Sequence, residues 1–123
     1  MTKTEQEIIS LVVQRYEAME SKYKLRKEIA VIKRWVTAKV AAEDFEGVDD
    51  NWYTEASYLD GGDRTKKIHV YTTDELEDLY RDYHGCSHEI TNILGRIRYH
   101  CKKHIKETSL ITEKNKLEKE LAQ

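Results

Sequence analysis

The chain has 123 residues and no proline, and 39% of its residues are hydrophobic while 36% are charged. An average globular domain is only about 25% charged, so this composition argues against a compact globule with one large core and favours long helices with a narrow apolar face. The net charge of −2 excludes the overall excess of positive charge that is typical of a nucleic-acid-binding domain.

The first predicted helix covers about residues 3–42. Thr4 and Glu7 have the spacing of a capping box, in which two side chains satisfy backbone amides at the start of a helix. A second apolar face widens the first half of the helix. The main stripe is Ile8, Leu11, Ala18, Leu25, Ile29, Ile32, Val36 and Val40. The second face is Ile9, Val12, Tyr16, Met19 and Tyr23.

Residues 43–72 form a small head, in which we expect a β-hairpin over about residues 52–72. Apolar and polar residues alternate from Trp52 to Leu59 and from Lys67 to Thr72, which is the period of a strand. The segment Asp60-Gly61-Gly62-Asp63 between them consists of residues that tolerate a tight turn.

The second long helix is predicted over residues 73–121 and starts at the cap signal Thr72-x-x-Glu75. Its apolar and small side chains recur at alternating steps of three and four residues, which is the pattern of a coiled-coil seam. We expect this seam to be buried against another helix. It comprises Leu76, Tyr80, Tyr83, Ser87, Ile90, Leu94, Ile97, Cys101, His104, Thr108 and Ile111.

We expect the two helices to pack as an antiparallel pair, which gives a mainly α, single-domain protein of residues 1–123. Residues whose numbers add up to about 116 would then face each other. The basic segment 22–39 would lie beside acids of the second helix, and the basic segment 96–106 would lie beside Glu17 and Glu20. Exposed ion pairs contribute only about 0–1 kcal/mol each, so they would choose the register rather than hold the fold.

One pair of helices leaves apolar surface uncovered. The second face of the first helix and a short seam at Leu110, Leu117 and Leu121 both need a partner, and a homodimer that forms a four-helix bundle or coiled coil is the simplest one. Because two strands alone are marginally stable in water, we also expect the hairpin to pack on Trp35, on Phe45 or on a second subunit.

Two histidine pairs on the second helix have the spacing of metal ligands. His84 and His88, and likewise His100 and His104, are four residues apart, so that each pair can hold a zinc or nickel ion on one helix face. On a continuous helix the two pairs are about 24 Å apart, so they form one site only if the helix breaks or if subunits bring them together. The helix would break at Gly85 or Gly95. A structural role is the more common one, and we predict no metal and no other cofactor.

The basic segment contains one aromatic residue and resembles a phosphate-binding helix face. A nucleotide or a nucleic acid is the ligand that such a face suggests, and each phosphate contact would make its affinity depend on salt. The alternative is the solvated side of a plain coiled coil, which we favour because acids on the first helix can neutralise the block. The candidate binding residues are Arg96, Arg98, Tyr99, Lys102 and Lys103.

The predicted head is rich in aromatic residues. Aromatic and arginine side chains make favourable contact points for proteins, and aromatic rings can also stack on bases. The alternative is that these rings form the small core of the hairpin itself, and the sequence favours neither interpretation. The candidate binding residues are Trp52, Tyr53, Tyr58, Arg64 and Tyr71.

The sequence contains no phosphate-binding glycine loop and no Gly-x-Ser-x-Gly motif, so we predict that the protein is not an enzyme. We expect a homo-oligomeric scaffold that acts as a small inhibitor or regulator through contacts with another protein. Short, helical chains rich in Lys, Glu and Tyr are common among accessory proteins of phages and mobile elements. The alternatives are a binder of a phosphate-bearing ligand and, third, a metal-dependent enzyme built on the histidines.

The cellular location is also predicted from what the sequence lacks. No apolar run approaches the roughly 20 residues that a membrane span needs, and the opening Met1–Glu5 is polar, so we expect a cytoplasmic protein with no membrane partner. Cys86 and Cys101 are expected to be reduced thiols, because one helix would hold them too far apart for a disulfide.

Overall fold

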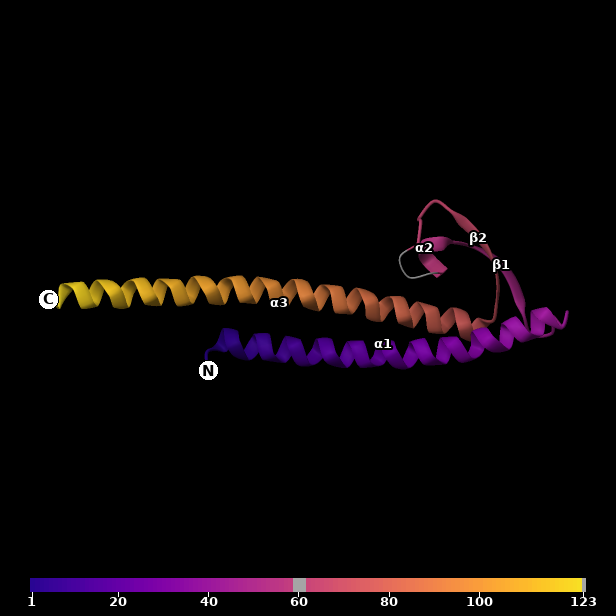
Figure 1. Cartoon of the computed structure of the whole chain (residues 1–123), viewed down its shortest axis with the longest axis horizontal. Helices are drawn as coiled ribbons and strands as arrows, with labels where there is room; N and C mark the ends of the chain where they lie inside the picture. The colour runs from indigo at the N-terminus through magenta and orange to yellow at the C-terminus, as the bar shows by residue number, and fades with distance from the viewer. Residues whose placement is uncertain (59–61, 123) are drawn as a thin grey trace. The chain divides into compact units, whose positions relative to one another are not determined.

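The computed structural model describes residues 1–58 and 62–122. In chain order its elements are α1 (Lys3–Ala41), β1 (Asp49–Thr54), α2 (Glu55–Tyr58), β2 (Lys67–Thr72) and α3 (Asp74–Leu121), which Figure 1 labels. The fold is mainly helical, with a two-stranded antiparallel sheet between two long helices, and the two predicted helix ranges are confirmed.

The contacts divide the chain into two compact units. Unit 1 combines Met1–Ala18 with Glu89–Gln123, and unit 2 is the continuous segment Met19–His88. Both α1 and α3 contribute residues to each unit. That residues 1–123 act as a single domain stays a prediction.

Both long helices start at a threonine cap, one or two residues away from the predicted one. The Thr2 hydroxyl oxygen accepts a hydrogen bond from the Glu5 backbone N–H at 3.1 Å, and the Thr73 hydroxyl oxygen accepts one from the Leu76 N–H at 3.1 Å. The predicted caps Thr4 and Thr72 are wrong, because both side chains are buried in the protein interior instead.

In unit 1, α1 and α3 pack antiparallel through small and branched apolar side chains. Leu11 and Ala18 of α1 and Ile93 of α3 are buried together, with Ile90 and Ile97 packed beside them. The expected burial of the α3 seam is confirmed here for Ile90 and Ile97, whereas the buried Ile93 was not part of the predicted seam. The predicted seam members Thr108 and Ile111 are wrong, since both are exposed.

The register in unit 1 differs from the predicted one. The Thr4 hydroxyl donates a hydrogen bond to Glu107 Oε2 at 3.2 Å, although the expected register would place residue 4 beside residue 112. His100 Nδ1 lies 3.1 Å from Glu7 Oε2. Packing of apolar side chains therefore decides the register, because exposed ion pairs are too weak to do so.

Unit 2 contains the second apolar cluster, in which the hairpin packs on both long helices. Its buried members are Ile29, Tyr58, Val70, Leu76 and Tyr80. They come from α1, α2, β2 and α3, so every layer of this unit contributes. Partly buried side chains surround them, namely Ile32, Tyr53, Ile68, Leu79 and Tyr83. The expected support on Phe45 is confirmed, because its ring centroid lies 5.7 Å from that of Tyr71 on β2. Trp35 is 47% exposed and contacts Lys39 instead.

The first strand of the hairpin starts and ends earlier than predicted. β1 pairs with β2 from Asp49 opposite Thr72 to Thr54 opposite Lys67, so the predicted second strand is confirmed and the first ends at Thr54. The Thr54 hydroxyl then accepts a hydrogen bond from the Ser57 N–H at 3.3 Å, which starts the short helix α2 in place of more strand. The predicted turn at residues 60–63 lies partly outside the described residues.

Three further predictions concern the continuity of α3, the cysteines and membrane-spanning helices. α3 has no break at Gly85 or Gly95, and no disulfide involves Cys86 or Cys101. Within the described ranges, no helix combines the length and the apolar character that crossing a lipid bilayer requires.

Candidate functional site

The hairpin has an inner and an outer face, and the predicted aromatic residues are divided between them. Side chains alternate along a strand, and Trp52 pairs directly with His69. Trp52, His69 and Tyr71 therefore share the outer face. Tyr53 and Tyr58 contact the apolar cluster instead, where they help to form the core of unit 2.

The outer face holds a row of aromatic rings in contact with one another. The rings of Trp52 and His69 lie edge to face with centroids 5.2 Å apart, and His69 meets Tyr71 in the same way at 5.1 Å. Phe45 extends the row, at 5.7 Å from Tyr71, and His69 also pairs with Asp50. Because Trp52 remains 67% exposed, this row is a surface of the kind that proteins use as a contact point.

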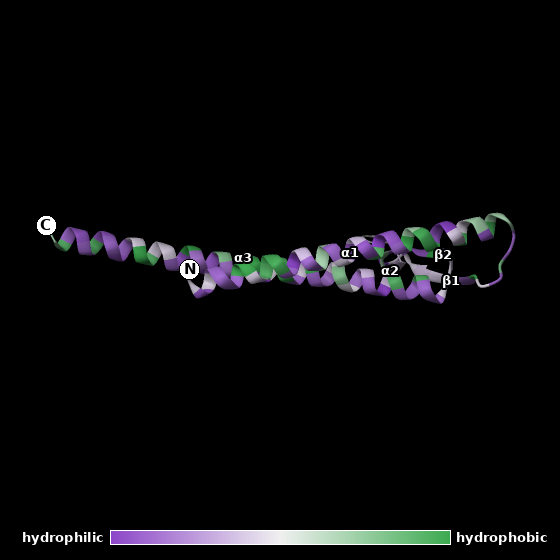
Figure 2. Cartoon of the chain, turned by 90° about the horizontal axis from the view of Figure 1, so that it is seen from below, coloured by the Kyte–Doolittle hydropathy of each residue, from purple (hydrophilic) through white to green (hydrophobic). Residues whose placement is uncertain are grey.

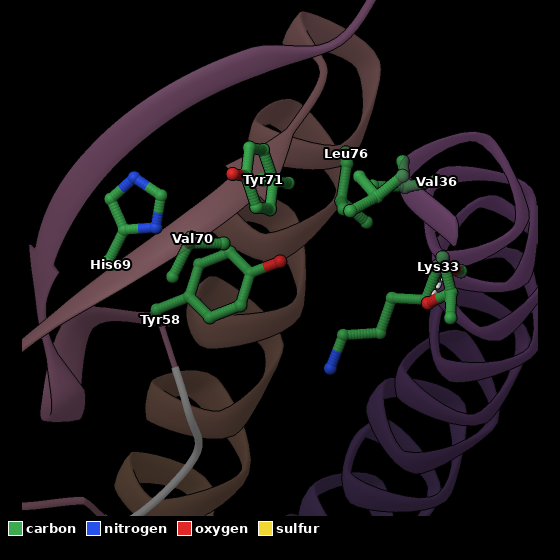
Figure 3. A pocket seen from close by; sticks show the side chains of 9 residues that line it. Lys33, Val36, Tyr58, His69, Val70, Tyr71 and Leu76 are labelled. Atoms are coloured by element: carbon green, nitrogen blue, oxygen red, sulfur yellow. Dashed lines mark hydrogen bonds between the residues drawn. The ribbon is translucent and has the colours of Figure 1, made fainter. Parts of the chain in front are cut away.

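A groove of about 480 Å³ lies between β2 and α1, and we name it the α1–β2 groove. Figure 3 shows the helix on one side and the strand on the other, with Tyr58 and Leu76 between them. The α1 side of the groove is lined by Lys33, Val36, Thr37 and Val40. The remaining lining residues are Tyr58, His69, Val70, Tyr71 and Leu76.

The charged group of the α1–β2 groove is Lys33. Its Nζ lies 5.6 Å from the ring centroid of Tyr58 and 5.4 Å from that of Tyr80, which are distances of a cation–π contact. No carboxylate in the described part of the chain pairs with this ammonium. Burial raises the pKa of Tyr58 to about 12, so the phenol beside Lys33 is neutral at ordinary pH.

A second hollow of about 520 Å³ lies between the head and α3. The Tyr53 hydroxyl forms a hydrogen bond with Glu77 there, and burial followed by this bond raises the pKa of Tyr53. His84 and His88 line the same hollow. His84 Nε2 is buried and has no hydrogen-bond partner, which leaves this polar side chain available to a ligand.

The histidine pairs do not form a metal site in this structure. Among residues 1–58 and 62–122, no group of three or more His, Cys, Asp or Glu side chains is placed so that it could hold a metal ion. His100 lies beside Glu7, and His104 has a buried Nδ1 without a hydrogen-bond partner. The geometry therefore lends no support to the metal-dependent alternative.

A third hollow, of about 650 Å³, is lined by Trp35 together with carboxylates. Trp35 already holds a cation, because Lys39 Nζ lies 5.1 Å from its ring centroid. Lys39 Nζ also lies 3.0 Å from Asp44 Oδ2. Its hydrogen bond, followed by one from the Glu46 backbone, lowers the pKa of Asp44. Because an internal lysine already contacts the aromatic ring of this hollow, the hollow is a weaker candidate.

The basic segment of α3 lies in unit 1 and is exposed. Arg96, Arg98, Tyr99, Lys102 and Lys103 are all accessible to solvent, and the Tyr99 ring contacts only that of His100. The four basic side chains form no ion pair within the described part of the chain. Glu20 pairs with Lys24 on its own helix, whereas Glu7 of α1 lies beside His100 of this segment. Neutralisation of the four basic side chains by acids of α1 stays a prediction.

The structure also places residues that the sequence interpretation missed. Lys33, Thr37 and His69 line the α1–β2 groove, yet none belonged to the predicted site residues. Val36 and Thr37 follow Lys33 by three and four residues and precede Val40 by four and three, and this helical spacing was a detectable signal. Arg64 is exposed in the segment before β2, away from these lining residues.

Comparisons with known proteins identify no relative of this chain. No protein-family model, no curated protein and no solved structure matches it. The geometry of its own residues is therefore the basis for any functional proposal.

Proposed function

We propose that the protein is a non-enzymatic, homo-oligomeric scaffold that acts through protein–protein contacts. The observation that carries this proposal is the apolar surface that α1 exposes in unit 1. Ile9, Val12, Val13 and Tyr16 are all exposed there, with 51% of Val13 and 66% of Tyr16 accessible. They lie on one side of the helix, away from the Leu11 and Ala18 face that packs on α3.

The end of α3 supports the same proposal. Every residue from 108 to 122 is exposed, including Leu110, Ile111, Leu117 and Leu121. Figure 2 shows this stretch as a mostly hydrophilic helix that single hydrophobic residues interrupt. Isolated helices of this length are marginally stable in water, so a partner helix would stabilise the stretch.

A second copy of the chain is the simplest partner for both surfaces. Most soluble oligomers are symmetric homo-oligomers, and a twofold axis lets one apolar surface cover its own equivalent. Two antiparallel helix pairs joined in this way form a four-helix bundle. The aromatic outer face of the hairpin would remain available for a different protein, as an inhibitor or regulator requires.

Light scattering after size-exclusion chromatography tests the oligomer. We expect a mass of at least two chains at micromolar concentration. The double variant Ile9→Glu, Tyr16→Glu should shift the mass to that of one chain, because four carboxylates per dimer would be buried at the interface. The control Gln6→Glu, Ser10→Glu adds the same charge on exposed positions of the same helix and should keep the wild-type mass. A wild-type protein that is strictly monomeric would contradict the proposal.

A second candidate function is the binding of a phosphate-bearing ligand, and the unpaired basic segment of α3 favours it. Fluorescence polarisation with a labelled single-stranded oligonucleotide would measure this binding at two salt concentrations. Arg98→Glu, Lys102→Glu should abolish it, and the affinity of the wild type should fall with rising salt. Lys116→Glu, Lys119→Glu is the control, since it makes the same charge change further along α3. Equal binding by both double variants would argue against this candidate.

A further inference from the structure

The strand β2 has one edge without a strand partner. The sheet contains only β1 and β2 in the described part of the chain, and β1 pairs with a single side of β2. Apart from that pairing, residues 67–72 form no backbone hydrogen bond with any other residue that the structure describes. The outward N–H and C=O groups of β2 can therefore accept the backbone of another extended segment.

The free edge of β2 faces the α1–β2 groove. Three consecutive residues, His69, Val70 and Tyr71, line the groove, although their side chains point alternately to opposite faces of the sheet. Lining by residues from both faces of one strand fits a strand that presents its edge to the groove. Figure 3 shows this edge opposite α1.

The groove surface across from β2 is complementary to an extended chain that carries one apolar and one acidic side chain. Val36 and Leu76 form an apolar floor, and the Tyr58 ring lies beside them. The Lys33 ammonium, which pairs with no carboxylate of residues 1–58 and 62–122, supplies the positive charge of the groove. The other titratable side chains of the lining are His69, which is paired with Asp50, and the phenols of Tyr58 and Tyr71.

We propose that the α1–β2 groove binds an extended peptide segment of a partner protein as a third strand on β2. The segment directs an apolar side chain toward Val36 and Leu76 and a carboxylate toward Lys33. Strand addition of this kind obtains affinity from backbone hydrogen bonds and specificity from pockets for alternate side chains. This inference rests on the proposed function as a protein-binding scaffold and names the chemistry of the partner.

The first test selects ligands without assuming their sequence. A displayed library of random peptides of about ten residues, which is the upper end of ordinary strand length, is panned against the full chain. We expect enriched peptides to alternate apolar and other residues and to carry an acid. Enrichment of amphipathic helical peptides, or of none, would overturn the inference.

The second test asks whether the peptide backbone makes the contact. N-methylation of alternate residues in an enriched peptide removes half of its N–H donors and keeps every side chain. One of the two methylation patterns should abolish binding, and the other should leave it nearly unchanged, because only one edge of a strand faces β2. Hydrogen exchange should slow at residues 67–72 when the peptide binds. Equal tolerance of both patterns would overturn strand addition.

Matched variants locate the binding in the groove. Lys33→Glu should lower the affinity for the selected peptide by about tenfold or more. Arg34→Glu, at an exposed position of the same helix, should leave that affinity unchanged. Thr37→Trp, at an exposed position of the lining, should block the groove without burying a new polar group. Oligomer mass is measured on the same samples. A dimer that binds no peptide contradicts this inference alone, while a monomer that binds the peptide contradicts only the proposed oligomer.

Discussion

Thr4 and Glu107 are joined by a hydrogen bond between α1 and α3. The Thr4 hydroxyl donates to Glu107 Oε2 at 3.2 Å, and Thr4 itself is almost fully buried. This bond lies beyond the apolar packing of Leu11 and Ala18 in unit 1. It therefore extends the contact between the two helices to the first turn of α1.

Replacement of Thr4 by valine tests this bond. The variant keeps the shape of the side chain but leaves the half-buried Glu107 carboxylate without its donor, so the free energy of unfolding should fall by about 1–3 kcal/mol. Urea denaturation would measure the change. Thr112→Val is the control, because Thr112 is exposed and bonds only to the Thr108 carbonyl of its own helix. An equal loss in both variants would contradict an interhelical role.

The cap of α3 should depend on Thr73 and not on its neighbour in the sequence signal. Thr73→Ala removes the acceptor of the Leu76 N–H and should lower the free energy of unfolding by about 1 kcal/mol. Thr73→Ser keeps the acceptor and should retain most of the wild-type free energy of unfolding. Thermal unfolding followed by circular dichroism measures both. A serine variant as unstable as the alanine variant would rule out the cap.

The segment after α1 contains a strained residue. Glu43 has a φ of 56°, in the left-handed region, where glycine has no steric cost. Glu43→Gly should therefore raise the free energy of unfolding by up to about 1 kcal/mol, because relief of about 1–2 kcal/mol of left-handed strain exceeds the entropy cost of about 0.4–1 kcal/mol that a glycine adds through the unfolded state. Glu46→Gly is the control, since its φ is not positive, and it should lower stability. Chemical denaturation of the two variants decides the sign.

Tyr58 should make folding sensitive to high pH. Its pKa is raised from 10.0 to about 12, mainly by burial, so the stability it contributes is fully present below about pH 10 and is lost as the pH rises through 12. Absorbance of the phenolate, followed during a pH titration, should show a late step that Tyr58→Phe removes. A Tyr58→Phe variant with the wild-type titration curve would contradict this assignment.

Asp44 should titrate differently without Lys39. The hydrogen bond from Lys39 is the first cause of the lowered pKa of Asp44, so Lys39→Gln should move that pKa toward 3.8. Because the folded pKa is lowered, the contribution is present above 3.8 and is lost as the pH falls through the folded value. Carboxyl NMR shifts measure it, and Lys27→Gln, whose ammonium lies over Tyr23 instead, should leave Asp44 unchanged.

The helical part of the fold was predictable because its signals are local and repeated. The apolar stripe from Ile8 to Val40 recurs at helical spacing, and each of its members is buried or half-buried in the structure. The second face, from Ile9 to Tyr23, is exposed as expected. Many residues report the same period, so an error at one of them changes little.

The caps and the head were harder to predict because each depends on one or two residues. Thr2 and Thr4 both precede a glutamate by three residues, and only the burial of Thr4 against α3 decides between them. Alternation continued to Leu59 in the sequence, but β1 ends where Thr54 caps α2. Short segments with two competing local signals are settled by their tertiary contacts.

The sequence by itself determined two long helices, a sheet between them and an apolar face on α1 that α3 does not cover, because periodicity records which side of an element avoids water. Only the tertiary structure decided the helix register, the burial of Tyr58 in the core of unit 2 and the position of Lys33 beside the free edge of β2. These relationships join residues far apart in the chain. They depend on how side chains of different elements fit together, and no local pattern contains that information.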